Sequence, residues 1–297
     1  MEKHYTICPV CSSADLQHKL NALDYTVSKK EFEIWECNNC TLRFTQDVPD
    51  GDAIAAYYHA DSYISHTNTN KGLINRLYHL VRKLTLSSKR RMILSLTGLR
   101  KGKLLDIGAG TGAFVQHMQT NGWMTAGLEP DAAARQQAQK VNNIELSSPE
   151  NFFLFQPDSF DVITLWHVLE HVHDLHEYLT QLNKIIKQQG KIFIAVPNYT
   201  SFDAVFYKKY WAAYDVPRHL YHFSPLSLKY LFNQHGFELQ STRAMWYDSF
   251  YISFLSEKYK KNKLGLLRGL FIGFFSNLQA FINKEHCSSL IYIINKR

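Results

Sequence analysis

From residue 101 onward, short apolar runs alternate with longer stretches of helical periodicity. Apolar runs bounded by turn-forming residues predict buried strands, and the stretches between them predict crossover helices. Such alternation gives a parallel sheet with helices on both faces. The predicted fold class is therefore α/β, a Rossmann-like, doubly wound sheet of seven strands, at residues 103–107, 124–128, 143–146, 160–165, 191–196, 237–242 and 290–295.

Three helices of this region have recognisable boundaries. One follows a glycine-rich turn at 113–121, and an Ala- and Gln-rich one covers 132–141. The third begins at Ser224-Pro225, since serine caps a helix well and proline suits its first position. It ends at Gly236, a residue type that commonly terminates helices.

The residues before this region have a different pattern. Apolar residues at three- and four-residue spacing predict a helix with one face packed on a domain: Leu73, Leu77, Leu80, Val81 and Leu84. We expect residues 47–100 to be a helical connector that covers the binding site as a lid. The aromatic and polar run at 57–66 would either reach the substrate or form a solvent-facing loop. The predicted units are thus 1–46, 47–100 and 101–297.

Residues 1–46 contain two C-x-x-C pairs, formed by Cys8 with Cys11 and by Cys37 with Cys40. Two such turns deliver four thiolates, the tetrahedral ligand set that zinc prefers. A site closed by four thiolates has no open position for chemistry, so the predicted zinc is structural and the unit is zinc-ribbon-like. The fifth cysteine, Cys287, stands alone and is expected to be an inert thiol.

A glycine-rich turn follows the first strand of the α/β region. Asp106 precedes glycines at 108, 110 and 112, and Glu129 ends the next apolar run. Glycines at a strand-to-helix turn let the backbone approach a ligand closely. A carboxylate at the end of the second strand can accept two hydrogen bonds from a ribose. The turn lacks the Gly-Lys-[Ser/Thr] sequence of a P-loop, which excludes that class of phosphate site.

This turn, Asp106-Ile-Gly-Ala-Gly-Thr-Gly112, resembles the first motif of class I S-adenosylmethionine (SAM) dependent methyltransferases. Residues 158–172 and 190–198 are similar to the next motifs of the group that contains ubiquinone-pathway O-methyltransferases, and the likeness covers about 101–236. The resemblance implies a SAM site formed by Asp106, Gly108, Gly110, Gly112 and Glu129. It also implies Trp166 and His167 beneath the methionine part of SAM. Ser148, Pro149 and Glu150 would flank the adenine, although the usual acidic residue there is not obvious.

The segment 210–223 is too rich in Tyr, Trp, Arg and His for a passive linker, and it follows the fifth strand, where these enzymes hold their acceptor. We expect Tyr214, Arg218, His219 and Tyr221 to bind the substrate. Arg218 would pair with an anionic acceptor or with a carboxylate of the protein. The candidate general bases are His219 first and His167 second, with His171 and His222 as further histidines of the region.

Two further stretches, one basic and one apolar, are candidate contact surfaces. The net charge is +7, and no Asp or Glu occurs from Ser62 to Leu105, where ten Lys and Arg residues lie. This span is either a solvated helix face or a contact for nucleic acid or anionic lipid. Residues 264–282 are apolar but contain Arg268, Ser276, Asn277 and Gln279, so they predict a packed helix or one that makes peripheral membrane contact rather than a span.

Three functions fit the sequence. The first is a methyltransferase for O- or C-methylation of a small-molecule acceptor. The second is an RNA methyltransferase that uses the zinc unit and the basic connector, although an Asn/Asp-Pro-Pro-[Tyr/Phe] motif is absent and 196–198 is the nearest stretch. The third is a non-catalytic SAM-binding protein. The N-terminus has no apolar core of signal-peptide type, so a cytoplasmic location is expected.

Overall fold

The computed structural model describes residues 2–51, 53–58 and 73–297, and the side chains of the first long helix from Leu84 onward. The connector residues 59–72 and the side chains of 73–83, on which the expected lid depends, lie outside this description. The described helices are α1 (Leu73–Thr97), α2 (Ala113–Gln119), α3 (Ala132–Gln137), α4 (Leu175–Ile185), α5 (Phe202–Tyr207), α6 (Pro225–Gln234), α7 (Asp248–Tyr259) and α8 (Gly265–Ile282).

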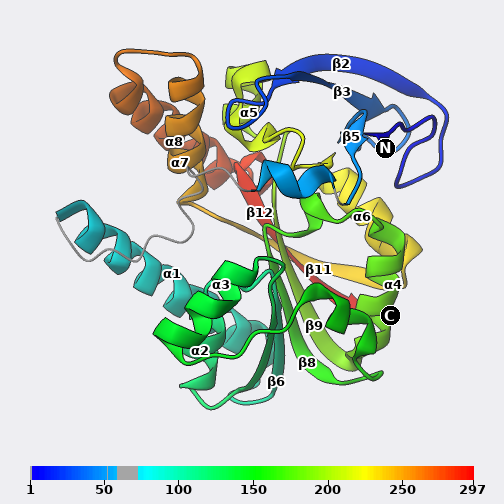
Figure 1. The fold of residues 1–297 in the computed structure, drawn as a ribbon, viewed down its shortest axis with the longest axis vertical. Helices are drawn as coiled ribbons and strands as arrows, with labels where there is room; N and C mark the ends of the chain where they lie inside the picture. The colour runs from blue at the N-terminus through cyan, green and yellow to red at the C-terminus, as the bar shows by residue number, and fades with distance from the viewer. Residues whose placement is uncertain (1, 52, 59–72) are drawn as a thin grey trace.

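A mixed six-stranded sheet forms the centre of the molecule (Figure 1). Its order is β11-β12-β9-β8-β6-β7, in which β7, β6, β8 and β9 are parallel and β12 is antiparallel to both of its neighbours. The strands are β6 (Lys103–Ile107), β7 (Met124–Leu128), β8 (Phe160–Trp166), β9 (Ile186–Pro197), β11 (Phe237–Ala244) and β12 (Ser289–Lys296).

The strand expected at 143–146 is not formed. The chain instead makes one isolated parallel bridge between Leu128 and Ser147. The amide of Ser147 donates to Gly127 and its carbonyl accepts from Glu129. Pro149 then begins a 3₁₀ helix, η4 (Pro149–Leu154), with no N–H to continue a ladder. The described sheet therefore has six strands rather than the expected seven.

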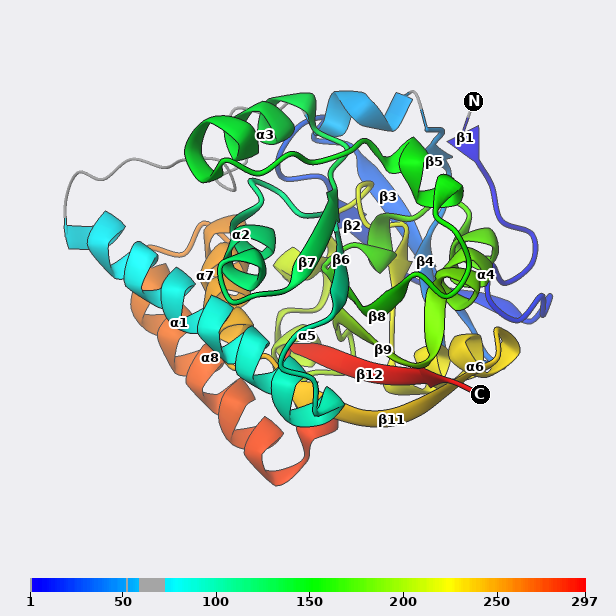
Figure 2. The same cartoon turned by 90° about the horizontal axis from the view of Figure 1, so that it is seen from below.

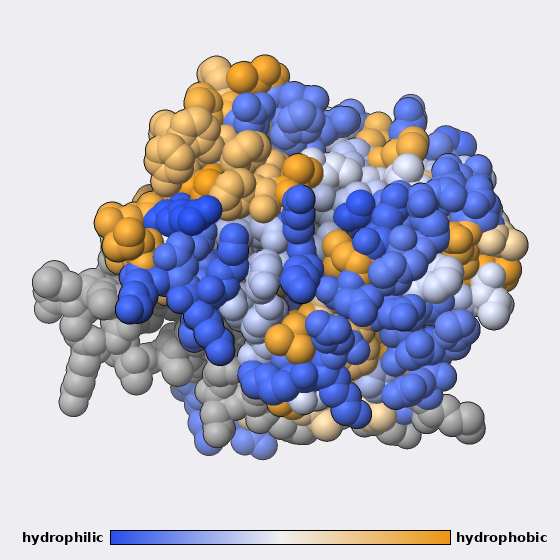
Figure 3. Space-filling view, turned by 90° about the horizontal axis from the view of Figure 1, so that it is seen from above, coloured by the Kyte–Doolittle hydropathy of each residue, from blue (hydrophilic) through white to orange (hydrophobic). Residues whose placement is uncertain are grey.

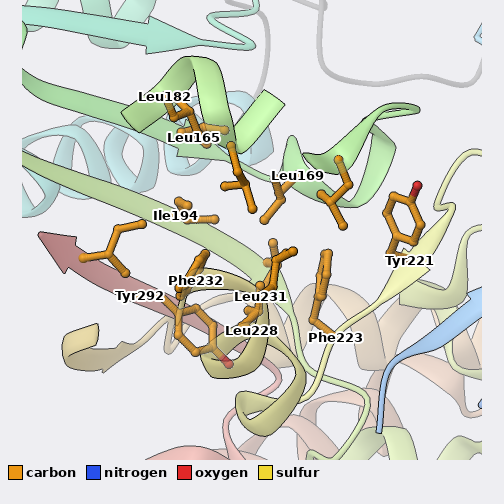
Figure 4. Packing of buried hydrophobic residues seen from close by; sticks show 14 of the residues in the cluster. Leu165, Leu169, Leu182, Ile194, Tyr221, Phe223, Leu228, Leu231, Phe232 and Tyr292 are labelled. Atoms are coloured by element: carbon orange, nitrogen blue, oxygen red, sulfur yellow. The ribbon is translucent and has the colours of Figure 1, made fainter. Parts of the chain in front are cut away.

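Helices cover both faces of this sheet, as the pattern of strands and helices predicted. α1, α2 and α3 lie on one side, and α4 and α6 lie on the other, in both views (Figures 1 and 2). On the second side, leucines and aromatic residues of α4 and α6 meet β8, β9 and β12 (Figure 4). This core contains Leu165, Leu169, Leu182, Ile194, Tyr221, Phe223, Leu228, Leu231, Phe232 and Tyr292.

The N-terminal residues form two small sheets. β1 (Glu2–Lys3) pairs with β5 (Val48–Pro49). A four-stranded antiparallel sheet has the order β10-β4-β3-β2, from β2 (Leu16–Leu23), β3 (Glu31–Cys37), β4 (Arg43–Thr45) and β10 (Tyr221–His222). Because β10 belongs to the segment 210–223, the N-terminal sheet is completed by the part of the chain that was expected to hold the acceptor.

Candidate active site

The glycine turn connects β6 to α2 at the carboxyl edge of the parallel strands. Gly108, Gly110 and Gly112 all have positive φ, of 72°, 55° and 72°. A Cβ on Gly108 would clash with Val168, and one on Gly112 would lie 3.2 Å from Cβ of Ala138. A Cβ on Gly110 would have no described protein atom within 4 Å. The first and third glycines therefore permit close packing, whereas the second faces open space.

Glu129 follows β7 and lies against this turn. Its Oε2 accepts a hydrogen bond from the amide of Gly110 at 2.7 Å, and its Oε1 accepts one from the amide of Asp131 at 3.0 Å. The side chain is mostly buried. The backbone amide of Glu129 donates a hydrogen bond to the carbonyl of Ser147, two residues before Pro149. The structure thus brings Glu129, Gly110 and the start of η4 to one edge of the sheet.

Asp106 at the end of β6 is buried, and the half-buried Lys89 of α1 interacts with it electrostatically. Oδ1 of Asp106 accepts a hydrogen bond from Oγ1 of Thr164 at 2.5 Å. Burial raises the pKa of Asp106 to about 7, although Thr164 and the charge of Lys89 act in the opposite direction. Burial lowers the pKa of Lys89 to about 8, against the attraction of Asp106 and Asp248. Lys89, from α1, was not singled out as a site residue by the sequence pattern.

Trp166 ends β8 beside Lys89. The Lys89 Nζ lies 3.9 Å from the centroid of the indole, and Phe114 meets the same ring edge-on at 5.8 Å. Nε1 of Trp166 is buried and has no hydrogen-bond partner within the described part of the protein. The carboxyl end of β8 therefore presents the apolar indole surface, its unsatisfied N–H donor and the neighbouring cation of Lys89.

His167 is held between two carboxylates. Its Nε2 lies 3.0 Å from Oδ2 of Asp248 and its Nδ1 lies 3.3 Å from Oε1 of Glu170. Burial alone would lower the pKa of His167, but these hydrogen bonds and charges outweigh it and raise the pKa to about 10. A protonated ring has no free lone pair to accept a proton, and the expected role of His167 as a general base stays a prediction.

His219 lies in a cluster with Glu170 and His171. The rings of His171 and His219 meet edge-on at 4.6 Å, and one ligand atom of each of the three residues lies within 4.8 Å of the other two. Nδ1 of His219 lies 2.8 Å from the carbonyl of Ala213. A carbonyl only accepts, so in the neutral ring Nδ1 carries the hydrogen and Nε2 keeps its lone pair.

Glu170 connects His219 to His167. Burial would raise the pKa of Glu170, but the hydrogen bond and charge of His167 and the charges of His219 and His171 lower it below its usual value. The carboxylate is fully buried, and its Oε2 has no hydrogen-bond partner among the described residues. Burial, with the charge of His219 second, lowers the pKa of His171 to about 4, so that ring is neutral at pH 7.

The other expected substrate residues make contacts within the protein. Arg218 pairs with Asp215 through Nε at 3.0 Å and through Nη2, and its Nη1 donates to the carbonyl of Tyr57 at 3.1 Å. The hydroxyl of Tyr214 accepts from Arg43 at 2.9 Å, and that of Tyr221 donates to the carbonyl of His173 at 3.2 Å. Of the four, His219 has the contacts best suited to chemistry, and the others brace the segment 210–223.

The four cysteines of the N-terminal pairs come together. Sγ of Cys8 lies 3.5 Å from that of Cys40, Sγ of Cys11 lies 3.4 Å from that of Cys37, and all four lie within 4.8 Å of one another. A tetrahedral zinc site with Zn–S bonds of about 2.3 Å needs sulfurs about 3.8 Å apart. The donor set and its spacing therefore fit zinc.

Three residues at the site escaped the sequence analysis: Lys89, Glu170 and Asp248. Glu170 had a weak signal, since it follows His167 by three residues in a turn after a strand. Lys89 is one of many cations in the connector, and Asp248 begins a helix 81 residues after His167. Their placement depends on how α1 and α7 pack on the sheet, which the sequence pattern does not determine.

Comparison with known proteins agrees with this geometry. An "Uncharacterized methyltransferase" of Alkaliphilus oremlandii is 31% identical over 113 residues, which are 37% of this chain and 51% of that protein. A ubiquinone biosynthesis O-methyltransferase of Vibrio atlanticus is 33% identical over 109 residues, 34% of this chain and 46% of that protein. The chain thus spans about half the length of the curated relatives it matches.

Solved structures and the sequence model of a domain family extend the comparison. A Galdieria sulphuraria protein proposed to be a sarcosine dimethylglycine methyltransferase superposes with a TM-score of 0.51 at 15% identity, covering 75% of this chain and 88% of that one, which supports the fold alone. The methyltransferase domain model matches residues 78–242. This match extends over more than half of the chain, which therefore belongs to the class I SAM-dependent methyltransferase family.

Proposed function

We propose that this protein transfers a methyl group from SAM to a small-molecule acceptor, at an oxygen or a carbon atom. The observation that carries the proposal is the pairing of Gly110 with Glu129. An open-faced glycine at positive φ and a buried carboxylate meet at the carboxyl edge of the parallel strands. Ligands of doubly wound sheets bind at this edge. The relatives named as ubiquinone biosynthesis O-methyltransferases support an oxygen acceptor.

The residues present fit SAM. The backbone of Gly108–Gly112 would approach it closely, Glu129 would accept hydrogen bonds from its ribose, and Pro149 would flank its adenine. The indole of Trp166, whose Nε1 has no partner among the described residues, and the cation Lys89 suit the methionine part. When bound, SAM supplies an electrophilic methyl group on a sulfonium. The protein's main task is then to position the acceptor for in-line attack.

On the acceptor side, we assign the general base to His219. Its Nδ1 is engaged by Ala213, which leaves Nε2 to take up a proton from the acceptor. Glu170 lies close enough to stabilise the imidazolium that forms. His167 is already charged through its two carboxylate partners, so its role in the proposal is to orient Glu170 and to add positive charge beside the SAM site.

The four-cysteine cluster is proposed to hold a structural zinc ion. Backbone geometry favours such a role, since Ser12 and Thr41, each directly after the second cysteine of a pair, adopt positive φ of 57° and 61°. The amide of Val10 and the side-chain amide of Asn39 point at Sγ of Cys8 and Sγ of Cys11, each at 3.4 Å. Such donors stabilise thiolates.

The test of the SAM assignment is Gly110→Val, with Gly98→Val as its control. Both glycines have positive φ, 55° and 71°, and at neither does an added Cβ meet a described atom within 4 Å. The backbone strain is therefore matched, and only Gly110 lies at the proposed site. Isothermal titration calorimetry should show at least about 100-fold weaker SAM binding for Gly110→Val, since a branched side chain blocks the backbone approach, and near-normal binding for Gly98→Val. Equal affinities would refute the assignment.

A further inference from the structure

Helices α7 and α8 form a hairpin that packs through small residues. Gly265, Gly269 and Gly273 recur every four residues and are buried against α7. A Cβ on Gly269 would lie 3.0 Å from Cα of Phe254, and one on Gly273 would lie 2.9 Å from Cα of Phe250. The two backbones are thus in close contact, and apart from Ile272 the residues that α8 buries are small.

Most of the large apolar side chains of α8 consequently point outward. Phe281 is 80% exposed, Leu267 68% and Phe271 60%. Figure 3 shows the hydrophobic residues of this region gathered on one side of the surface. The face consists of Leu264, Leu266, Leu267, Leu270, Phe271, Phe274, Leu278, Phe281 and Ile282. A core helix buries its leucines and phenylalanines, so this reversed arrangement indicates a surface built to contact another apolar phase.

Basic residues predominate around this face, and the nearest acidic residues in the chain are the buried Glu257 and the exposed Glu285. No Asp or Glu occurs from Lys258 to Lys284, a stretch that holds six basic residues. Arg268 is paired with the buried Glu257 at 3.2 Å, while the lysines of the turn between the helices are exposed. An apolar helix face bordered by lysines is complementary to an anionic bilayer surface, where each lysine adds to the attraction.

The hairpin also adjoins the proposed SAM site. α7 begins at Asp248, which contacts His167. Trp246, Tyr247 and Tyr251, at the same end of α7, are exposed. Such aromatic side chains favour the boundary between lipid and water. The outward apolar face and the site mouth are therefore linked through one short helix.

We propose that the α7–α8 hairpin docks this protein on anionic lipid, with α8 lying in the interface by its outward face. By length and hydropathy, Gly265–Ile282 meets the criteria for a membrane span. Its glycine face is occupied by α7, however, and the other face alone is available, which fits a helix that lies on the bilayer. Docking is separate from methyl transfer and does not depend on the acceptor.

The test is co-sedimentation of the full chain with vesicles of phosphatidylcholine and phosphatidylglycerol, compared with phosphatidylcholine alone. The wild type should bind the anionic vesicles more strongly, and added salt should weaken that binding. Lys261→Gln/Lys263→Gln should bind about 20- to 30-fold more weakly, because each lysine contributes about fivefold near an anionic surface. Leu267→Ser/Phe281→Ser should lose at least about 10-fold through reduced apolar contact.

Matched variants elsewhere control for general effects of charge and hydropathy. Lys101→Gln/Lys103→Gln removes two exposed charges, and Met124→Ser/Val141→Ser removes two exposed apolar side chains, both away from the hairpin. These should bind vesicles like the wild type. Thermal melting of every preparation reports folding, and SAM calorimetry reports the SAM site, so failure of the SAM assignment would not mimic failure of docking.

Two results would overturn the proposal. One is that the wild-type protein stays in the supernatant with anionic vesicles, or that all the hairpin variants bind these vesicles as strongly as the wild type does. The other is that the wild type does not bind vesicles and sediments as a dimer, whereas Leu267→Ser/Phe281→Ser sediments as a monomer. That outcome would assign the outward face of α8 to a second copy of the chain.

Discussion

At the scale of single residues, spacing in the sequence located the part of the candidate site that is proposed to bind SAM. Gly110, Glu129 and Trp166 follow neighbouring strands, and parallel strands deliver their carboxyl ends to one edge, so their proximity could be predicted. The contact of His167 with Asp248 could not be predicted, since Asp248 comes from a distant helix. That partner matters for the chemistry of His167, because its hydrogen bond, together with that of Glu170, raises the pKa of the ring to about 10 against the effect of burial.

His219 is the residue on which the proposed catalysis depends. His219→Asn should keep a donor toward the carbonyl of Ala213 but lose the Nε2 lone pair. We expect turnover to fall about 10²- to 10⁴-fold, with SAM affinity and melting temperature nearly unchanged. The measurement is steady-state kinetics with an identified acceptor, alongside thermal melting of the same preparation. Normal turnover in this variant would leave positioning alone as the source of catalysis.

Lys89 should make SAM binding dependent on pH. Its pKa is about 8, so it is mostly charged at pH 7 and mostly neutral at pH 9.5. If its charge holds the carboxylate of SAM, affinity should decrease about 10- to 100-fold as pH rises through 8, the usual range for a hydrogen bond to a charged group. Lys89→Met should bind weakly at pH 7 and change little over the same interval.

Asp106 also titrates near neutrality, so the wild type alone does not isolate the lysine. Because the charge of Lys89 also lowers the pKa of Asp106, both proteins are compared with Asp106→Asn added, and the ratio of their affinities at each pH then reports Lys89. Calorimetric titrations at several pH values give this ratio. A ratio that stays constant between pH 7 and 9.5 would exclude Lys89 from the binding of SAM.

At the scale of elements, strands with continuous apolar runs were predicted correctly. β6, β7 and β8 begin at the expected residues, because their Leu, Ile and Val positions are buried on both faces. The failure at 143–146 has a local cause, since Pro149 limits the pairing to a single bridge. β9 begins at Ile186, earlier than the expected 191, because the buried Ile186 pairs with Phe160 at the start of β8, and regular pairing resumes at Lys191 after an irregularity in register.

The glycine stripe of α8 leads to a prediction about the hairpin. Gly269→Val would force a branched side chain against the backbone of Phe254, which cannot rotate away. We expect the free energy of unfolding to fall by about 1–3 kcal/mol, the usual cost of overpacking. Leu270→Val, on the exposed face one residue later, introduces the same β-branched residue into the helix without the clash. Chemical denaturation should separate the two variants, and equal losses would mean that the hairpin is loosely packed.

At the scale of the whole molecule, the N-terminal cysteine unit and the segment 210–223 form one sheet. β10 pairs with β4, so that Tyr221 lies opposite Phe44. Oγ1 of Thr45 donates to the carbonyl of His219 at 2.7 Å, and the amide of Thr45 donates to Leu220. Hydropathy and the C-x-x-C spacing predicted the two parts separately. Their pairing could not be predicted, because a two-residue strand has too short a pattern to recognise.

This pairing implies that loss of the proposed zinc should affect turnover as well as stability. Cys37 ends β3, which pairs with β4, and β4 supports the backbone at His219. Cys37→Ser should release one zinc per chain, expose residues 1–46 to limited proteolysis and lower turnover. SAM affinity should change little, because the residues proposed to bind SAM lie at the carboxyl edge of the six-stranded sheet, outside the N-terminal sheet.

Cys287→Ser is the matched control, since Cys287 is equally buried but lies outside the cysteine cluster. Elemental analysis should find zinc retained in that variant, with turnover near that of the wild type. Wild-type protein that is fully folded and free of metal would contradict the zinc assignment. If Cys37→Ser released zinc yet kept normal turnover, the contacts of β4 with the backbone at His219 would have no effect on catalysis. The expected result is a joint loss of metal and turnover, because one short strand connects the cysteine unit to the proposed base.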